Sequence, residues 1–362
     1  CQFSDGESIL LVDVIFLFRF IMSNGETVFA QIMDLLSDYE LEKCIDKYNG
    51  DYKNKKFTCR DQFMVLSYAQ FTRYSSLRVV EATLTAFFSK LYYSGLKLIP
   101  KSTFAEMTEN KNWLIYKNFA QVFIKRASDL YKDDYFRIGL KEMVYAFDSS
   151  STIKLCLSLC SWAKFHHNKG TFKMHTLINL RGSIPTFIWL TEGKVNDING
   201  LNVIHVEPEV YYLLDKGYMD FYRPYNYFQK CNVFYVTRAK DNMKYEVIQE
   251  YEVDQQTGVV CDMIIRRSGP TVSKDYSDKM RLVIYEDYAE EKSTVYRFLI
   301  NDFELTTLTV AELYRERWQI ELFFEWIKQH LHIQSFFGTT ENAVYTQIYM
   351  DCGQLLFAAY HC

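Results

Sequence analysis

The sequence is poor in several features that would define simple classes of protein. Its 362 residues include only 5 Pro, and 49% are hydrophobic and 17% aromatic, which excludes a disordered, collagen-like or low-complexity chain. The nine Cys contain no CxxC pair. Cys156 and Cys160, with His166 and His167 nearby, lack the second close ligand pair that a zinc site needs. The cysteines are therefore expected to be reduced and buried.

Long apolar runs and an excess of basic charge are also missing. The apolar run at residues 9–22 is interrupted by Asp13 and Arg19, and it is shorter than the roughly 20 residues that cross a bilayer. No basic residue precedes it, unlike in a signal peptide. We expect Met22 to be the natural start, residues 1–21 to be upstream or non-native sequence, and the protein to be cytoplasmic without a membrane partner. The net charge of -4 argues against a generic nucleic-acid coat but allows a local phosphate-binding cleft.

The length indicates two to three domains, and the first of them is expected to be helical. Residues 22–140 carry apolar residues at helical spacings, which predicts a mostly helical N-terminal domain of a DNA-binding type. Ser102 or Thr103, followed by Glu106, offers a capping signal within it. Four lysines are scattered among its apolar residues: Lys101, Lys111, Lys117 and Lys125. They suit either a solvated helix face or a DNA-contacting surface.

Strand-like runs dominate the rest of the chain, residues 141–362. One apolar run ends at Asp148, and further strands are expected at residues 171–179, 184–191, 210–214 and 233–236. Residues 241–308 are again rich in β-favouring residues and are interpreted as a β-rich insertion. Several strands followed by a strong helix indicate an α/β core.

The most informative segment is a helix predicted to run from Val310 to about His332. Thr309 and Glu312 have the spacing of a capping box at its start. Five apolar residues share one face of this helix: Leu313, Ile320, Phe324, Ile327 and Leu331. A second stripe lies beside them, about 21 Å long at 1.5 Å per residue. It consists of Tyr314, Arg317, Glu321 and Lys328.

This second stripe has two interpretations. One is a salt-bridged, solvated surface, because Arg317 and Glu321 are four residues apart and can pair. The other is a phosphate-binding face, because Arg, Lys and Tyr side chains are apt partners for phosphate oxygens. A carboxylate between them would serve DNA only by holding a divalent metal ion.

The spacing Tyr-x2-Arg-x3-Glu-x6-Lys resembles the signature of the IS4-type bacterial insertion-sequence transposases. Asp148 in YAFDSSST and Asp215 in LLDKGYMD stand where this family has its two other acidic residues. The segments KGTFKMHTLINLRGSIPTFIWLTEGKVND and FYVTRAKDN are similar to family segments. KKFTCRDQF, SSLRVVE and PKSTFAEM resemble the N-terminal domain that often precedes the core. The resemblance covers about residues 23–350.

The resemblance implies an α/β fold with an RNase H-like catalytic core, interrupted by the β-rich insertion between the second Asp and the Glu. Asp148, Asp215 and Glu321 are implied to be catalytic and to be the metal ligands. The implied cofactor is Mg²⁺ or Mn²⁺, as a pair of ions that activate the attacking oxygen and stabilise the leaving one. The three carboxylates would otherwise repel one another and raise one another's pKa values.

The resemblance also implies a set of DNA contacts and a reaction. Tyr314, Arg317 and Lys328 would hold phosphates near the transposon end, with Trp318 and Arg238 as further contacts. The reaction is metal-dependent cleavage at the ends of an insertion sequence, followed by strand transfer into target DNA in cut-and-paste transposition. The partners are double-stranded DNA, as terminal inverted repeats and as target, and a second copy of the chain in a synapsed homodimer. The expected location is the bacterial nucleoid.

Several features depart from the family pattern. Three Ser follow Asp148, and Glu325 stands where a Lys is common. Residues 241–308 lack the Trp on which related members stack a flipped base and contain only Tyr and Phe as aromatic residues. Base flipping therefore stays open, with a Tyr as a candidate for that role. The last residues, MDCGQLLFAAYHC, resemble the family poorly, so a C-terminal truncation is expected. Two alternatives stay open: an inactive or truncated copy that only binds inverted-repeat DNA, and a metal-dependent nuclease without strand transfer.

Overall fold

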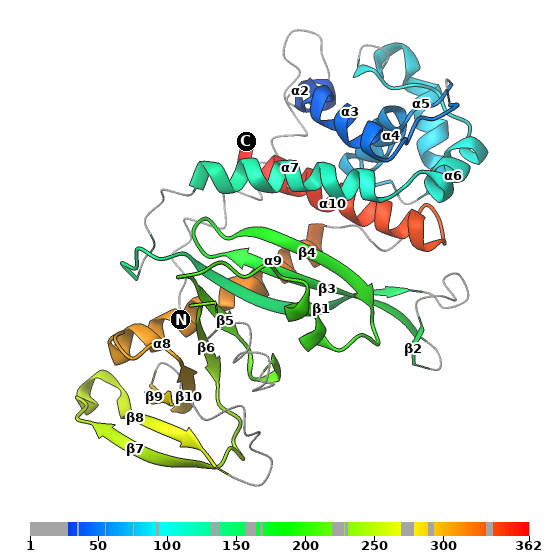
Figure 1. The fold of residues 1–362 in the computed structure, drawn as a ribbon. Coiled ribbons are helices and arrows are strands. Elements are labelled where there is room, and N and C mark those ends of the chain that lie inside the picture. Colours follow the sequence, from blue (N-terminus) through cyan, green and yellow to red (C-terminus); the bar gives the residue numbers. More distant parts are fainter. Residues whose placement is uncertain are drawn as a thin grey trace. The chain divides into compact units, whose positions relative to one another are not determined.

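The computed structural model describes most of the chain (Figure 1). The described residues are 28–34, 36–54, 56–74, 76–91, 94–131, 136, 138–155, 164–166, 169–218, 228, 231–268, 279–288, 293–330 and 336–361. The expected upstream segment, residues 1–21, lies outside them, and so do Met22, Cys156 and Cys160. Within the described residues, no helix combines the length and the apolar character that a membrane span requires.

The chain divides into two compact units, which we describe separately. The first contains residues 131–152 and 172–324. The second contains the described residues up to Leu130, those of 153–171, and those from Glu325 onward. The last helix of the chain is therefore grouped with the N-terminal helices, a division that no sequence motif indicates. The domain boundary near residue 140 stays a prediction.

The second unit is built mainly from helices. They are α2 (Val28–Asp34), α3 (Asp38–Lys47), α4 (Cys59–Phe71), α5 (Leu77–Leu91), α6 (Lys101–Asn110), α7 (Leu114–Tyr131) and α10 (Glu341–His361). Helix α4 starts at a capping box, in which the side chains of Thr58 and Asp61 each accept a hydrogen bond from the other residue's backbone N–H. Helix α10 packs against α4 and α6. Helix α6 follows Pro100 and has no side-chain cap, so the capping signal expected from Ser102 or Thr103 is wrong.

Two of the four scattered lysines serve packing within this unit. The Lys111 Nζ donates to the Gly50 carbonyl at 2.8 Å and to the Asp51 carboxylate at 2.6 Å, and the side chain is buried. The Lys117 Nζ lies over the rings of Trp113 and Tyr349, and burial lowers its pKa. The prediction of a solvated or DNA-contacting lysine surface therefore applies only to the exposed Lys101 and Lys125.

The first unit is built on a mixed sheet. Its strands are β1 (Val144–Leu155), β3 (Lys169–Asn179), β4 (Ile184–Glu192), β5 (Tyr211–Leu214), β6 (Phe234–Arg238), β7 (Tyr245–Tyr251), β8 (Val259–Arg267), β9 (Met280–Asp287) and β10 (Thr294–Ile300). They lie in the order β4-β3-β1-β5-β6-β10-β9-β8-β7. A short strand, β2 (Lys164–His166), pairs with the start of β3. These residues, like the last three of β1, fall in the part of the chain that is grouped with the second unit. Three short 3₁₀ helices are also described: η2 (Asp197–Asn202), η3 (Lys216–Tyr218) and η5 (Gln255–Thr257).

The register of two parallel pairs places the acidic residues. Strand β1 pairs with β5 in parallel, with Phe147 opposite Leu214, and β5 pairs in parallel with β6. Asp148 and Asp215 directly follow the paired residues Phe147 and Leu214 in the chain. Both acids therefore lie side by side where the pairing of β1 with β5 ends. Strand β1 runs on to Leu155, so the prediction that this strand ends at Asp148 is wrong.

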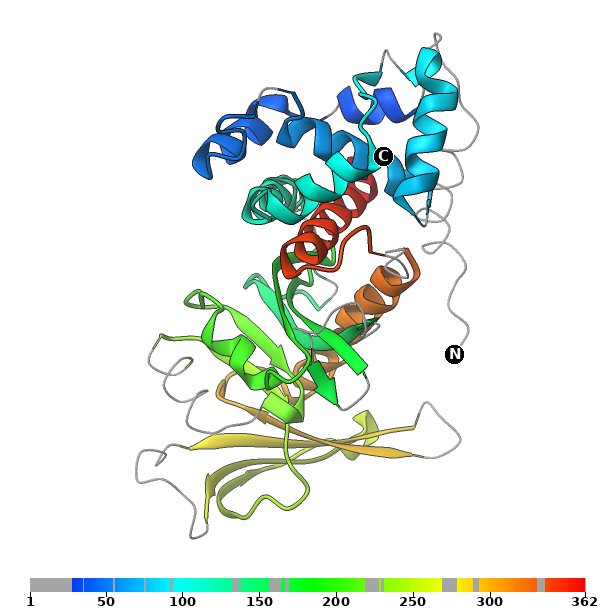
Figure 2. The same ribbon diagram turned by 90° about the vertical axis from the view of Figure 1, so that its right-hand side faces the viewer.

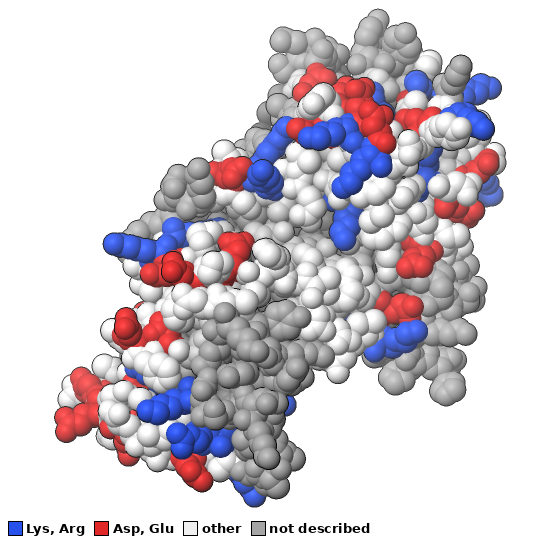
Figure 3. All heavy atoms as spheres, viewed as in Figure 1, with Lys and Arg blue, Asp and Glu red and all other residues white. Residues whose placement is uncertain are grey.

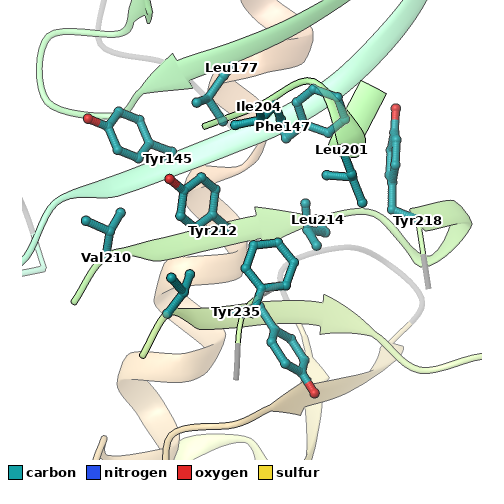
Figure 4. Packing of buried hydrophobic residues seen from close by; sticks show 12 residues of the cluster. Tyr145, Phe147, Leu177, Leu201, Ile204, Val210, Tyr212, Leu214, Tyr218 and Tyr235 are labelled. Atoms are coloured by element: carbon teal, nitrogen blue, oxygen red, sulfur yellow. The ribbon is translucent and has the colours of Figure 1, made fainter. Parts of the chain in front are cut away.

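A buried aromatic layer supports that edge. Alternate residues of neighbouring strands point to one side of the sheet, where they form a single cluster (Figure 4). The cluster includes Tyr145, Phe147, Tyr212, Leu214 and Tyr235. Gly200 lies against it so closely that an added Cβ would stand 2.6 Å from the Phe147 ring. The residue next to Asp148 is therefore tightly packed on the core side.

The β-rich insertion continues the core sheet. Strand β10 pairs antiparallel with β6, with Phe298 opposite Arg238, and β10, β9, β8 and β7 follow one another as antiparallel neighbours. Figure 2 shows these strands in yellow and orange, below the green strands of the core. The prediction of a β-rich segment over residues 241–308 is in this respect confirmed.

The predicted long helix is two helices. Helix α8 covers Thr307–Glu316 and α9 covers Trp318–His330, with Arg317 between them. The N-cap is Thr306, whose side chain accepts from the Thr309 N–H, so the prediction of a start at Val310 is wrong. The apolar face is correct as far as the structure describes it, because Leu313, Ile320, Phe324 and Ile327 are all buried. Leu331 lies outside the described residues.

Helix α10 carries a buried acid that gives a test of the fold. Asp351 is 2% exposed, its Oδ2 has no hydrogen-bond partner among the described residues, and burial raises its pKa well above the ordinary value. A raised native pKa gives a stability contribution that is full below the unfolded-state pKa and is lost as the pH rises through the native pKa. We predict that Asp351→Asn stabilises the protein at pH 8 and has little effect at pH 4. Urea unfolding at both pH values measures this.

The matched control is Asp46→Asn, because Asp46 is exposed on α3. This change should leave the urea midpoint within error at both pH values. An Asp351→Asn variant with the same shift at pH 4 and pH 8 would contradict the prediction.

Candidate active site

The site is centred on Asp148, which β1 holds at the edge of the core. Its Oδ1 accepts hydrogen bonds from the Ser149 N–H at 2.7 Å and from the Tyr218 hydroxyl at 3.2 Å. The Tyr218 hydroxyl also contacts the Ser149 hydroxyl at 2.9 Å. The Tyr218 ring packs edge-on against Phe147 with ring centroids 5.2 Å apart. Asp148 is thus oriented by hydrogen bonds on one side and by aromatic packing behind it.

Burial and a neighbouring acid make the ionised form of Asp148 costly. The pKa of its carboxyl is raised to about 6, chiefly by burial and further by the charge of Asp215. The Ser149 N–H, the Arg317 guanidinium and the Tyr218 hydroxyl act in the opposite direction. A carboxylate in this condition is stabilised by any additional positive charge that comes close to it.

Helix α8 brings a phenol to the second acid. Tyr314 is 7% exposed, and its hydroxyl donates to the Asp215 Oδ1 at 3.3 Å. Burial raises the pKa of the Tyr314 phenol above its ordinary value, so it stays protonated and remains a donor. Its ring packs on Phe298 of β10 with centroids 4.9 Å apart. The insertion therefore contacts the site directly through β10.

Arg317, at the break between α8 and α9, connects the first acid to the third. Its Nη1 is 3.5 Å from the Asp148 Oδ2, and its Nη2 is 2.5 Å from the Glu321 Oε1. The guanidinium also lies over the Tyr314 ring, 5.4 Å from the centroid. The salt bridge to Glu321 matches the first interpretation of the helical stripe, but Arg317 is largely buried and its second partner belongs to the core. The stripe is therefore part of a site and not only a solvated surface.

The remaining predicted residues lie further out. Arg238 is half-buried, with its guanidinium 5.3 Å from the centroid of the Tyr296 ring. Trp318 is 51% exposed at the start of α9. Lys328 is exposed on α9, seven residues after Glu321. The structure thus brings together Asp148, Asp215, Tyr314, Arg317 and Glu321, and it leaves Trp318 and Lys328 open to solvent.

The three carboxylates suit a divalent ion in their chemistry. All their potential ligand atoms are hard oxygens, and burial together with the charge of Asp215 raises the pKa of Asp148 even though Arg317 lies beside it. Glu321 is bound to Arg317, and among the described residues no group of three His, Cys, Asp or Glu side chains is arranged to hold a metal ion. The oxygen donors of the three acids fit a divalent ion, but in this structure Glu321 is paired with Arg317 and not grouped with the two Asp residues.

Sequence reasoning did not single out Tyr218 and Ser149. A signal was present in both cases, because Ser149 directly follows Asp148 and Tyr218 comes three residues after Asp215. The pairing of β1 with β5 is what turns these two local positions into one hydrogen-bonded group. Ser149 contacts Asp148 as its neighbour in the chain, whereas Tyr218 is brought to Asp148 only by the register.

Comparison with known proteins identifies the family. A family model described as the transposase DDE domain matches residues 140–355, which is more than half of the chain. The chain belongs to this DDE transposase family. A second model, described as a domain of unknown function (DUF4372), matches residues 24–97. The family assignment implies an RNase H-like core, and it confirms the expectation of a DNA-cleaving and strand-transferring enzyme of DNA transposition. DDE transposases act on DNA and generally use divalent metal ions.

Individual relatives agree with the assignment. A putative transposase, y4zB, from Sinorhizobium fredii is 33% identical over 195 residues, which are 53% of this chain and 53% of that protein. A probable transposase for insertion sequence element IS5377 from Geobacillus stearothermophilus is 24% identical over 90% of this chain and 82% of its own length. A putative transposase for insertion sequence element IS4SA from Synechocystis is 25% identical over 74% of this chain and 73% of its own length. The expected resemblance to bacterial insertion-sequence transposases is confirmed.

The Tyr218 hydroxyl gives a test of this DDE site. We predict that Tyr218→Phe lowers the rate of DNA-end cleavage about tenfold, because loss of an outer-shell hydrogen bond typically costs 10–100-fold. The physical reason is that Asp148 loses a donor to its ionised form. Single-turnover cleavage at saturating DNA and varied Mn²⁺ concentration measures the effect, and more Mn²⁺ should be needed for half-maximal rate.

Tyr212→Phe is the control, because Tyr212 belongs to the same aromatic cluster and, among the described residues, its hydroxyl accepts from the Glu207 N–H at 3.1 Å and not from a residue of the site. The same loss of rate in both variants would show that packing, and not the hydrogen bond to Asp148, is responsible.

Proposed function

We propose that this chain is an IS4-type transposase that cuts DNA at the ends of an insertion sequence and joins those ends to target DNA. The observation that carries the proposal is the assembly of Asp148, Asp215, Tyr314, Arg317 and Glu321 from two neighbouring parallel strands and the α8–α9 junction. The order β4-β3-β1-β5-β6, with β1, β5 and β6 parallel, supports the RNase H-like assignment of the core.

The catalytic residues in this proposal are Asp148, Asp215 and Glu321. They would hold the divalent cofactor, Mg²⁺ or Mn²⁺ as a pair of ions, which when bound supplies activation of the attacking oxygen and stabilisation of the leaving one. One carboxylate oxygen of Glu321 is engaged by the Arg317 guanidinium, so that oxygen would become available to a metal ion only when the guanidinium moves away. Tyr218 and Ser149 keep Asp148 oriented throughout.

The DNA contacts in this proposal are Tyr314, Arg317, Lys328, Trp318 and Arg238. Lys328 and Trp318 are exposed and therefore available to a duplex. A phosphate at Arg317 would compete with Asp148 and Glu321 for the guanidinium, whose fork geometry suits bidentate phosphate binding. Phosphate binding at Arg317 would thus free Glu321 while holding the scissile bond in place.

The distribution of charge supports a local grip on DNA. On the face shown in Figure 3, the described Lys and Arg side chains lie interspersed with Asp and Glu. Several bases are neutralised by acids, as in the pairs Arg60–Asp38 and Lys97–Asp61. We propose that the ends are recognised as inverted repeats by a homodimer synapsed on DNA, with target DNA joined afterwards.

The first experiment tests the acidic residues. We predict that Asp148→Asn reduces cleavage of DNA bearing the element's inverted repeats at least about 1000-fold, because a neutral amide replaces an ionised ligand. DNA-end affinity, measured by gel shift, should stay within about threefold. Asp241→Asn is the matched control, because Asp241 is exposed just after β6.

The parent protein distinguishes the open alternatives in the same assay. Binding without any cleavage would show a copy that only binds inverted repeats. Cleavage without joining would show a nuclease. Cleavage by Asp148→Asn at the parent's rate would overturn the assignment of the metal ligands.

The second experiment tests Arg317. We predict that Arg317→Gln weakens DNA-end binding and lowers the slope of log affinity against log salt by about one, as expected for loss of one phosphate contact. Without DNA, the same variant should bind Mn²⁺ more tightly than the parent, because no guanidinium competes for Asp148 and Glu321. Fluorescence anisotropy and isothermal titration calorimetry measure the two effects.

Arg315→Gln is the control on the same helix, because Arg315 is exposed and pairs loosely with Asp287 at 3.6 Å. Unchanged Mn²⁺ affinity in Arg317→Gln would mean that the two carboxylates are not shared between the guanidinium and a metal ion.

A further inference from the structure

The β-rich insertion contains a buried ion pair that faces the start of α8. Asp262 on β8 is 2% exposed and Arg281 on β9 is 5% exposed. The pair is bidentate, with the Arg281 Nε 2.9 Å from Asp262 Oδ1 and the Nη2 2.6 Å from Oδ2. Burying two charges costs several kcal/mol per ion, and apolar residues of similar size are often as stable or more so. Stability alone therefore does not explain the pair.

Further side-chain hydrogen bonds join the pair to the residues on either side of the α8 N-cap, and one of them runs from the Arg281 Nη2 to the Thr307 hydroxyl at 3.4 Å. The Arg281 Nη1 donates to the Leu305 carbonyl at 2.5 Å, directly before the N-cap Thr306. The Thr307 hydroxyl, on the first residue of the helix, donates to the Asp262 Oδ2 at 2.8 Å. The two charged residues thus hold the chain on both sides of the N-cap, and α8 packs against β8 and β9.

The core also holds the loop that joins β10 to α8. The Asn301 side chain accepts from the Tyr235 N–H at 2.8 Å and donates to the Val233 carbonyl at 2.8 Å. The Asp302 carboxylate accepts from the Tyr211 hydroxyl and from the Glu304 N–H. The first residues of the loop between β10 and α8 are therefore fixed to β5 and β6, while Leu305 and the first residue of the helix are fixed to the insertion.

Helix α8 connects its first turn, held by the ion pair, to the residues of the site. Thr307 and Tyr314 are seven residues apart, about 10 Å along a helix at 1.5 Å per residue and on nearly the same face. Tyr314 reaches Asp215, and Arg317 follows at the end of the helix and reaches Asp148. A shift of the first turn would move both contacts together.

We propose that Asp262 and Arg281 are positioning residues of the transposase: through Thr307 and Leu305 they set the place of α8 and so of Tyr314 and Arg317. The proposal rests on the proposed function for the roles of Tyr314 and Arg317 in catalysis. It gives the insertion a part in the reaction that is separate from any contact it makes with DNA.

The test separates position from folding and from DNA binding. Thr307→Val removes the hydroxyl that links the pair to α8 and leaves the ion pair in place. The double variant Asp262→Leu/Arg281→Met removes the pair but keeps apolar volume, so it is the second variant should Thr307→Val be too mild. The readouts are the ¹⁹F resonance of 3-fluorotyrosine placed at position 314, the single-turnover cleavage rate at saturating DNA, and the Kd for the DNA end.

Thr257→Val is the matched control, because Thr257 lies in the loop between β7 and β8 and its hydroxyl donates to the Asp254 carbonyl. We expect the first two variants to shift or broaden the resonance and to lower the cleavage rate at saturating DNA at least tenfold. They should weaken DNA-end binding no more than Arg317→Gln does, because they displace Arg317 without removing it. The control should change none of the three.

The outcomes distinguish this inference from the proposed function. A parent protein that does not cleave its DNA would sink the proposed function, while the resonance would still decide whether the pair positions Tyr314. In a parent that cleaves, an unmoved resonance or an unchanged rate in both variants would overturn the inference alone. DNA-end binding weaker than that of Arg317→Gln would also overturn it, since the pair would then contact DNA itself.

Discussion

Two carboxylates repel one another where the pairing of the parallel strands β1 and β5 ends, and the rest of the site is arranged around that repulsion. The register of β1 and β5 sets it, because Phe147 lies opposite Leu214 and the acids follow directly. Each acid then has its own neutral donor, the Tyr218 hydroxyl for Asp148 and the Tyr314 hydroxyl for Asp215. These donors stabilise charge without adding any, so a demand for positive charge remains.

Arg317 meets part of that demand. It is placed by the break between α8 and α9, where its guanidinium reaches Asp148 of the core and Glu321 on the next turn. A single cation shared by two carboxylates is a compromise, since neither acid has it fully. A divalent ion would serve the acids better, and a phosphate would serve the guanidinium better. A metal ion bound to the acids would release Arg317 for a phosphate, and a phosphate bound to Arg317 would release the acids for a metal ion. Binding of each would therefore favour binding of the other.

The sequence predicted the chemistry of this site more fully than its architecture. Helical spacing and the family signature selected Tyr314, Arg317 and Glu321, because side chains three and four residues apart share a face. Spacing could not reveal the break at Arg317, since the apolar stripe runs through it. It also could not reveal Tyr218, whose contact with Asp148 depends on strand register. Lys111 looked like a surface residue because a buried lysine is recognisable only once its partner, Asp51, is known.

Local sequence patterns predict less about the insertion than about any other part of the site. Its β-favouring residues predicted strands, but not that β10 would join β6 and extend the core sheet. That continuity has a mechanical consequence, because a separate module could move without disturbing the site, whereas strands of the same sheet cannot. Phe298 packs on Tyr314, and the buried Asp262–Arg281 pair holds the first turn of the helix that carries it. The position of the phenol and the guanidinium is thus determined by residues between the second acid and the third, and the insertion belongs to the catalytic framework.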